Sequence, residues 1–275
     1  MTEYSFNTQS IGLEGVVNAR ELGGYVFPGG RIVRKGLLFR GGNLAKATDA
    51  DIALLSDKYH LAHCFDFRTA VEVKYAPDKD VPGAQHHFMP TIDPTTEKVG
   101  TTNLPPQAYK DLTGFIVENA HHPMLRNVAR SMYADMVRNE YTQLQYAAFL
   151  QMIANTEEGA VYWHCSQGKD RTGLGAALVL AALGADRDVI MQDFMISNEY
   201  YADVIEDALE KVRTSGGGLD GEDAVMTFIG VNKRYFTQAL DIIDSEYGSM
   251  MEYLTGPLCL TDRDISKMRE RLLCW

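Results

Sequence analysis

The 275-residue sequence predicts an α/β fold with a central, mostly parallel sheet flanked by helices and a helical C-terminal part. Residues 160–163 form an apolar, β-prone run that leads through a polar loop into a helical segment, 174–183, that is apolar on every side. Residues 61–68 form a second strand between two helices that open with capping-box patterns. After residue 222 every segment has a helical pattern, and none brings a strand partner.

The first third of the chain supplies further strands to the predicted sheet. Residues 24–27 and 31–34 flank a Pro-Gly-Gly turn, and this pattern predicts a β-hairpin. A short strand over 37–40 follows and ends at a pair of glycines. The sequence 48–51 resembles a capping box and predicts the start of an amphipathic helix.

The middle of the chain departs from regular α/β alternation. Residues 77–106 are rich in Pro, Gly, Thr and Asp, with one strand expected over 85–89. A long irregular stretch in a compact domain favours a functional loop or a mobile cover. Apolar and polar residues then alternate loosely over 109–136, and this pattern predicts a helical segment that connects the two halves of the sheet.

The remaining segments are helical, and we expect the C-terminal ones to pack on the same sheet. Helices are expected at 144–153, 188–196, 204–212, 222–229, 233–247, 249–254 and 261–273. Three glycines at 216–218 are too short for a domain linker, and the chain has no internal repeat. The sequence therefore predicts a single domain over residues 1–275.

Composition excludes several classes of function. A net charge of −11 argues against nucleic acid or an anionic membrane as the main partner. The four cysteines show no paired metal-ligand spacing, so we expect no metal and a reducing compartment. The chain has neither a leader pattern nor an apolar run near the ~20 residues of a membrane span. We expect a cytoplasmic protein without stable membrane insertion, with export by a route that lacks such a signal as the open alternative; no pattern indicates an oligomeric state.

The loop after residue 163 has the composition of a phosphate site. Cys165 and Arg171 have five residues between them, on a loop that closes onto a helix N-terminus. Backbone N–H groups in such a loop point inward and the helix dipole adds positive charge, so a tetrahedral dianion fits there. The same field lowers the pKa of a cysteine and prepares it as a nucleophile. An arginine can hold two phosphoryl oxygens with its planar fork of donors.

Further residues around Cys165 and Arg171 are expected to bind the phosphate or to hold the loop. They are His164, Ser166, Gln167, Gly168, Lys169 and Thr172. Thr172 can cap the helix and donate to the cysteine sulfur, and His164 can orient the loop through hydrogen bonds. Lys169 adds a second cation beside Arg171. No cofactor is needed for this chemistry.

The sequence His-Cys-(five residues)-Arg-Thr at 164–172 resembles the signature of the cysteine-dependent protein tyrosine phosphatase superfamily. Its Gly-Lys-Asp-Arg-Thr-Gly part is similar to that of bacterial tyrosine and lipid phosphatases. Residues 18–25 resemble the family's N-terminal Asn-Phe-Arg-Asp-Leu-Gly-Gly motif, with departures at Ala19 and Glu21. Residues 38–44 and 66–69 resemble two further family blocks.

This resemblance implies a protein tyrosine phosphatase-like fold with a helical lid, an insertion at about 93–138, over the catalytic loop. We expect a phosphomonoester hydrolase that forms a phosphocysteine at Cys165 and acts on phosphotyrosine in proteins. Two alternatives stay open: a phosphatase of phosphoinositides or inositol phosphates, and a phosphate-binding module without turnover.

Two aspartates are candidates for the general acid. Asp66 ends a strand next to a helix start, and the resemblance favours it if its strand lies beside that of Cys165. It could instead pair with Arg68 or accept from a capping N–H. Asp170 lies inside the loop, within reach of the phosphate, but could instead pair with Lys169 or serve as a cap.

Overall fold

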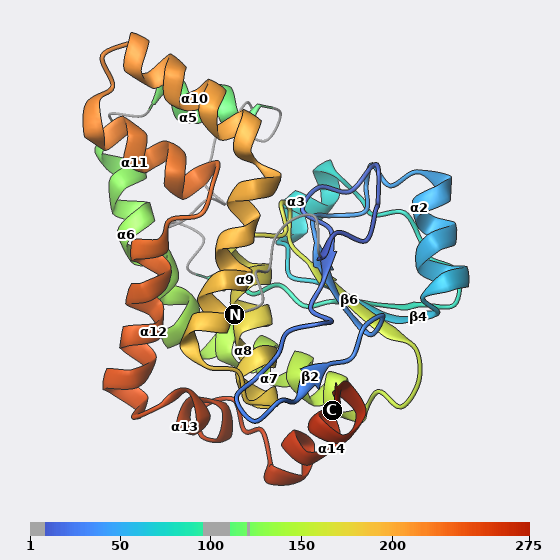
Figure 1. Cartoon of the computed structure of the whole chain (residues 1–275). Helices are drawn as coiled ribbons and strands as arrows, with labels where there is room; N and C mark the ends of the chain where they lie inside the picture. Colours follow the sequence, from blue (N-terminus) through green and yellow to red (C-terminus); the bar gives the residue numbers. More distant parts are fainter. Residues whose placement is uncertain (1–8, 96–110, 120–121) are drawn as a thin grey trace.

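The structure, a computed structural model, describes residues 9–95, 111–119 and 122–275 (Figure 1). Five strands form a sheet in the order β1-β3-β6-β4-β5. Neighbours run parallel except β1, which is antiparallel to β3. The strands are β1 Arg20–Glu21, β3 Leu38–Gly41, β4 Leu61–Asp66, β5 Gln85–Phe88 and β6 Ala160–His164. The predicted mostly parallel sheet is confirmed.

Helices cover this sheet in layers. Those nearest to it are α2 Asp49–Ala53 with the π-helical turn η1 Leu54–Lys58, α3 Ala70–Tyr75, α7 Glu140–Asn155 and α8 Asp170–Leu183. The outer ones are α5 Leu112–Glu118, α6 Pro123–Arg138, α9 Arg187–Tyr200, α10 Ala202–Thr214, α11 Gly218–Phe228, α12 Lys233–Tyr247, α13 Met250–Thr255 and α14 Asp262–Leu272. The capping boxes predicted at Thr48 and Thr69 are both present.

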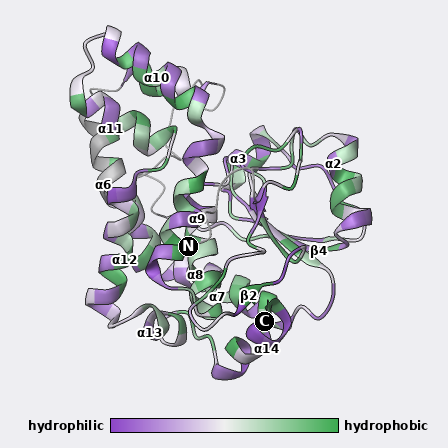
Figure 2. Ribbon diagram, viewed as in Figure 1, coloured by the Kyte–Doolittle hydropathy of each residue, from purple (hydrophilic) through white to green (hydrophobic). Residues whose placement is uncertain are grey.

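Side chains alternate between the two faces of the sheet, as strand geometry requires. Phe39, Cys64 and Tyr162 face a smaller apolar core that includes residues of α2 and η1. Phe65 and Trp163 point the other way, into a larger core shared with α7 and α8. Helix α8 is therefore buried on every side, whereas outer helices such as α10 alternate hydrophobic and hydrophilic residues (Figure 2).

The prediction that the C-terminal helices pack on the sheet is wrong. Helix α12 packs against α6, α13 against α8, and α14 against α7 and α8. The physical reason is that α7 and α8 already cover that face of the sheet, and the apolar outer side of α8 needs a further layer of helices. In Figure 1, α12 stands in the column of helices to the left of the sheet, α13 lies at its foot and α14 lies below the sheet.

The N-terminal hairpin exists, but one arm has a second partner. Val26 pairs with Ile32 across the predicted turn. Strand β2 Ile32–Val33 also pairs with β7 Leu273–Cys274, which ties the N-terminal hairpin to the last residues of the chain. None of the described helices combines the length and the hydropathy that a membrane span requires. Of the expected lid at about 93–138, residues 96–110 and 120–121 lie outside the described ranges.

Candidate active site

The cysteine loop connects the central strand β6 to the buried helix α8. Cys165 follows the last strand residue directly, and α8 begins at Asp170. The turn between them depends on Gly168, whose φ is +66° and whose added Cβ would lie 2.1 Å from the carbonyl carbon of Gly41. A side chain cannot be accommodated there, because the loop packs against the backbone at the end of β3.

The carbonyl groups of the loop face away from its mouth and are held from behind. Asn18 donates from Nδ2 to the carbonyls of Gln167 at 3.3 Å and Gly168 at 2.8 Å. Arg40 donates from Nη2 to the carbonyls of Gly168 and Lys169, at 2.9 and 3.2 Å. Residues from the first forty positions thus fix the orientation of the peptides that carry these three carbonyls.

A buried ion cluster keeps these two bracing side chains in place. Arg20 and Arg40, both fully buried, pair with the carboxylate of Asp193 on α9. Arg20 also donates to the side chain of Asn18. Because two guanidinium groups share one buried carboxylate, the cluster retains an excess of positive charge behind the loop.

The amide groups of the loop are left for an anion. The backbone N–H groups of residues 166–169 donate to no acceptor within the described ranges. The first N–H groups of α8 lack intrahelical partners by helix geometry. These donors, the helix dipole and the cluster behind them form a cradle for a tetrahedral anion.

Arg171, in the first turn of α8, is held by an acidic partner from another part of the chain. Its Nη1 and Nη2 donate to the two carboxylate oxygens of Glu72 on α3, at 2.8 and 2.6 Å. Nη1 also donates to the carbonyl of Phe67 at 3.3 Å. Of the five guanidinium N–H groups, these bonds occupy three, so two have no acceptor among the described residues and could bind an anion.

Glu72 connects three parts of the site. It completes the capping box of α3 with Thr69, and it accepts a hydrogen bond from the hydroxyl of Ser166 in the loop. Burial alone would disfavour its ionised form, but Arg171 and these hydrogen bonds lower the pKa of Glu72 to about 2. The carboxylate is therefore charged at neutral pH and fixes the guanidinium beside the loop.

Cys165, the expected nucleophile, is a buried thiol whose pKa lies below its ordinary value. Burial alone would raise the pKa of Cys165, but the charge of Arg171 and the nearby hydroxyl and N–H of Thr172 lower it. The Oγ1 atom of Thr172 is itself buried and has no hydrogen-bond partner of ordinary geometry among the described residues. The surroundings of Cys165 favour the thiolate.

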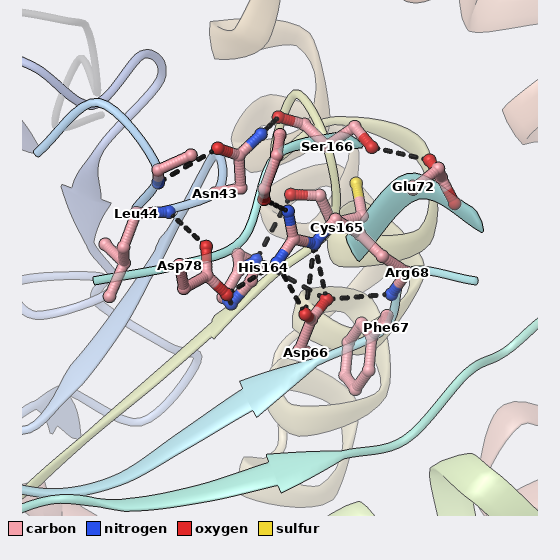
Figure 3. Close-up of polar contacts among 12 residues, drawn as sticks. Asn43, Leu44, Asp66, Phe67, Arg68, Glu72, Asp78, His164, Cys165 and Ser166 are labelled. Atoms are coloured by element: carbon pink, nitrogen blue, oxygen red, sulfur yellow. Dashed lines mark hydrogen bonds and ion pairs between the residues drawn. The ribbon is translucent and has the colours of Figure 1, made fainter. Parts of the chain in front are cut away.

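His164 lies beneath the loop in a network of acidic groups (Figure 3). Its Nδ1 is 3.2 Å from the carbonyl oxygen of Cys165, and its Nε2 is 3.2 Å from Oδ2 of Asp78. Burial would lower the pKa of this imidazole, but Asp66 and Asp78 raise the pKa of His164 well above its ordinary value. The charged ring can donate to the peptide of the nucleophile, which agrees with an orienting contribution.

Three residues of this network are of the types that ligate metal ions. Asp66, Asp78 and His164 each offer a ligand atom within 4.8 Å of the others. However, Arg68 donates to both carboxylates, at 2.7 Å to Oδ2 of Asp66 and 2.6 Å to Oδ2 of Asp78. The guanidinium supplies the positive charge between them, so the arrangement is that of an ion-pair network.

The two candidate acids have different surroundings. Asp66 is the register partner of His164 on the neighbouring strand, but both of its carboxylate oxygens accept hydrogen bonds from Arg68. Asp170 lies at the first position of α8, and its Oδ1 accepts a hydrogen bond from the hydroxyl of Tyr133 on α6. The structure thus brings Asp170 into the loop and keeps Asp66 below it.

The side chain of Lys169 does not lie beside Arg171, where the sequence led us to expect a second cation. Its ammonium group is buried and donates to the carbonyls of Phe228, Ile229 and Gly230, where α11 ends. Orphan carbonyls at a helix C-terminus attract a cation. The side chain therefore connects the loop to α11 and does not point to the phosphate cradle.

Sequence reasoning missed two residues of this site. Glu72 carried the signal of a capping box, which gave no hint that its carboxylate also pairs with Arg171, 99 positions away. Asp78 stood in an irregular stretch without a motif. A carboxylate shortly after a strand that ends at the predicted site was the available signal for both.

Comparison with known proteins agrees with this geometry. A family model described as the tyrosine phosphatase family matches residues 11–274. The chain is 31% identical over 268 residues to a Cupriavidus necator protein named as a tyrosine-protein phosphatase, covering 96% of this chain and 88% of that protein. It is 29% identical over 262 residues to the triple specificity protein phosphatase PtpB of Mycobacterium tuberculosis, covering 88% and 92%. Since the family match extends over nearly the whole sequence, including every element that builds the cysteine loop, this chain belongs to the tyrosine phosphatase family and is a cysteine-dependent phosphatase.

Proposed function

We propose that this phosphatase hydrolyses phosphotyrosine in proteins, with Cys165 as nucleophile, Arg171 as the phosphate-binding guanidinium and Asp170 as general acid. The observation that carries the proposal is the buried thiol of lowered pKa in a loop whose amides have no acceptor among the residues that the structure describes. An anion cradle with a thiolate at its base favours phosphoryl transfer to sulfur.

The reaction has two steps. The thiolate of Cys165 attacks phosphorus in line, forming the S–P bond while the bond to the leaving oxygen breaks and an aspartic acid protonates that oxygen. Water then attacks the phosphocysteine and releases phosphate and the thiolate. Because the transition state is loose, the loop amides and the two free N–H groups of Arg171 contribute charge stabilisation and positioning.

The surroundings of the aspartates support Asp170 as the acid. Asp66 forms a bidentate ion pair with Arg68 and lies against His164, so its carboxylate already has charged partners on two sides. Asp170 shares the loop with the nucleophile, and only one of its oxygens accepts a hydrogen bond among the described residues.

The placement of Lys169 favours phosphotyrosine over polyphosphorylated inositols. Additional phosphate groups would need cations near the mouth, and the ammonium of Lys169 is buried on the C-terminal carbonyls of α11 instead. Phosphoinositides remain the second candidate, because the Mycobacterium tuberculosis relative is named a triple specificity phosphatase.

Turnover of an aryl phosphate by the wild type, Cys165→Ser, Asp66→Asn and Asp170→Asn tests the assignments. We expect no turnover by Cys165→Ser, and a flattened basic limb of the pH–rate profile for Asp170→Asn but not for Asp66→Asn. Equal rates for Cys165→Ser and the wild type would refute the nucleophile. A flattened limb in Asp66→Asn alone would transfer the acid to that residue.

Substrate class is tested by a panel of phosphotyrosine peptides, phosphoserine peptides and phosphoinositides under the same conditions. We expect the highest kcat/KM for phosphotyrosine peptides. A phosphoinositide that exceeds them would contradict the proposed substrate and favour the second candidate.

A further inference from the structure

Asp170, the proposed general acid, contacts a helix that lies outside the cysteine loop. The hydroxyl of Tyr133, on α6, donates to Oδ1 of Asp170. Tyr133 is 1% exposed. The contributions assigned so far to Cys165 and to the loop amides do not require this contact. The contact joins the first residue of the catalytic helix to a segment more than thirty positions away in the chain.

The position of this hydroxyl is fixed by packing. The ring of Tyr133 meets Phe194 and Phe236 edge to face, with centroids 6.1 Å away in both cases. Those two rings stack on each other at 3.8 Å, and Phe194 directly follows Asp193, which anchors the arginines behind the loop. Close-packed aromatic rings leave the phenol few rotamers, so the oxygen is held in place relative to the loop.

The two oxygens of Asp170 consequently differ. Oδ1 accepts from Tyr133, whereas Oδ2 has no hydrogen-bond donor among the described residues. The ammonium of Lys169 is 3.9 Å from Oδ2, too far for a hydrogen bond, and it donates to three carbonyls at the end of α11. An ammonium group has three protons, so Lys169 has none left for Oδ2.

We propose that Tyr133 is a positioning residue for the general acid: its hydroxyl holds Oδ1 of Asp170, so that the transferable proton resides on Oδ2. This inference rests on the proposed function, which assigns the acid to Asp170. When the leaving oxygen takes the proton from Oδ2, Asp170 becomes a carboxylate and Oδ1 keeps the same donor. Burial and the neighbouring carboxyl raise the pKa of Tyr133 well above its ordinary value, so its hydroxyl remains a donor throughout.

The effect of Tyr133→Phe on kcat/KM should depend on the leaving group if the hydroxyl positions the acid, and should not depend on it if the hydroxyl is merely structural. General acid catalysis matters most when the leaving oxygen is basic, as in phenyl phosphate, and little when it is weakly basic, as in 2,4-dinitrophenyl phosphate. We expect Tyr133→Phe to lower kcat/KM about 10-fold for phenyl phosphate and less than about 2-fold for 2,4-dinitrophenyl phosphate. A structural defect would lower both by the same factor.

Tyr253→Phe is the matched control. Tyr253 is equally buried and donates to the carbonyl of Val137, also on α6, at 2.8 Å. Loss of the Tyr253 hydroxyl should reduce thermal stability to a similar degree, because each substitution removes one buried hydrogen bond that involves α6. In Tyr253→Phe, the ratio of kcat/KM for phenyl phosphate to kcat/KM for 2,4-dinitrophenyl phosphate should equal that of the wild type.

The double variant Tyr133→Phe/Asp170→Asn separates the two proposals. We expect Asp170→Asn to lower kcat/KM for phenyl phosphate by about 10²-fold or more, and the double variant to show no further loss. A further 10-fold loss in the double variant, or equal losses of Tyr133→Phe on both substrates, would overturn the positioning by Tyr133. If Asp170→Asn itself affected both substrates equally, the acid assignment would fail instead.

Discussion

The carboxylate of Glu72 gives the most direct test of how the site is held together. Replacement by Gln keeps the shape of the side chain and removes its charge, so Arg171 loses its buried ion pair. The amide oxygen can keep the cap on α3, which uses Oε2 of Glu72. The amide nitrogen then takes the place of Oε1, where the hydroxyl of Ser166 can accept from it instead of donating, but Nη2 of Arg171 loses its acceptor. The substitution therefore removes the buried charge together with one hydrogen bond to Arg171.

The magnitude follows from the pKa of Glu72, which is lowered from 4.5 to about 2. One pKa unit corresponds to about 1.4 kcal/mol, so ionisation of Glu72 stabilises the fold by about 3 kcal/mol at neutral pH. Because the pKa is lower in the folded state, this contribution is complete above about pH 4.5 and is lost as the pH falls toward about 2. Breaking a buried ion pair typically costs about 3–5 kcal/mol, which agrees with this value.

Denaturant unfolding of the wild type and Glu72→Gln measures the effect. We expect the variant to be about 3 kcal/mol less stable at about pH 7, and the difference to shrink to about 2 kcal/mol at about pH 3.5. Its kcat/KM on an aryl phosphate should fall by about 10²-fold, because Arg171 is no longer held beside the loop.

Asp51→Asn is the matched control for the capping contribution. Asp51 completes the capping box of α2 with Thr48 just as Glu72 does for α3 with Thr69, but it pairs with no arginine among the described residues. We expect Asp51→Asn to reduce stability and to leave kcat/KM within about 2-fold of the wild type. A Glu72→Gln protein with wild-type stability and kcat/KM would refute the reasoning.

Two further predictions concern the loop itself. Gly168→Ala should lower stability by about 2 kcal/mol or more and abolish most activity, because φ is +66° and the new Cβ meets backbone atoms. The control Gly216→Ala, at φ +81° with open space around it, should lower stability by only about 1 kcal/mol and keep activity. Thermal unfolding and turnover of an aryl phosphate measure both effects. Thr172→Val removes a hydroxyl that stabilises the thiolate of Cys165, so the midpoint pH of its alkylation by iodoacetamide should rise; an unchanged midpoint would contradict this assignment.

The sequence by itself determined the features that depend on neighbouring residues. The strand, loop and helix around Cys165 could be predicted because an apolar run, two glycines and a five-residue spacing all lie within about twenty positions. The capping boxes at Thr48 and Thr69 are equally local and are present in the structure. The parallel sheet followed from the alternation of strand and helix patterns.

Only the tertiary structure decided which distant groups meet at the loop. Glu72 lies 99 positions from Arg171, and Tyr133 lies 37 positions from Asp170, so no spacing rule links either pair. Lys169 could have turned toward a phosphate, but its flexible side chain ends on the carbonyls of α11, because those unpaired acceptors lie nearby and would be costly to bury without a donor. Periodicity and spacing describe one segment at a time, whereas these contacts depend on how the packed segments are placed relative to one another.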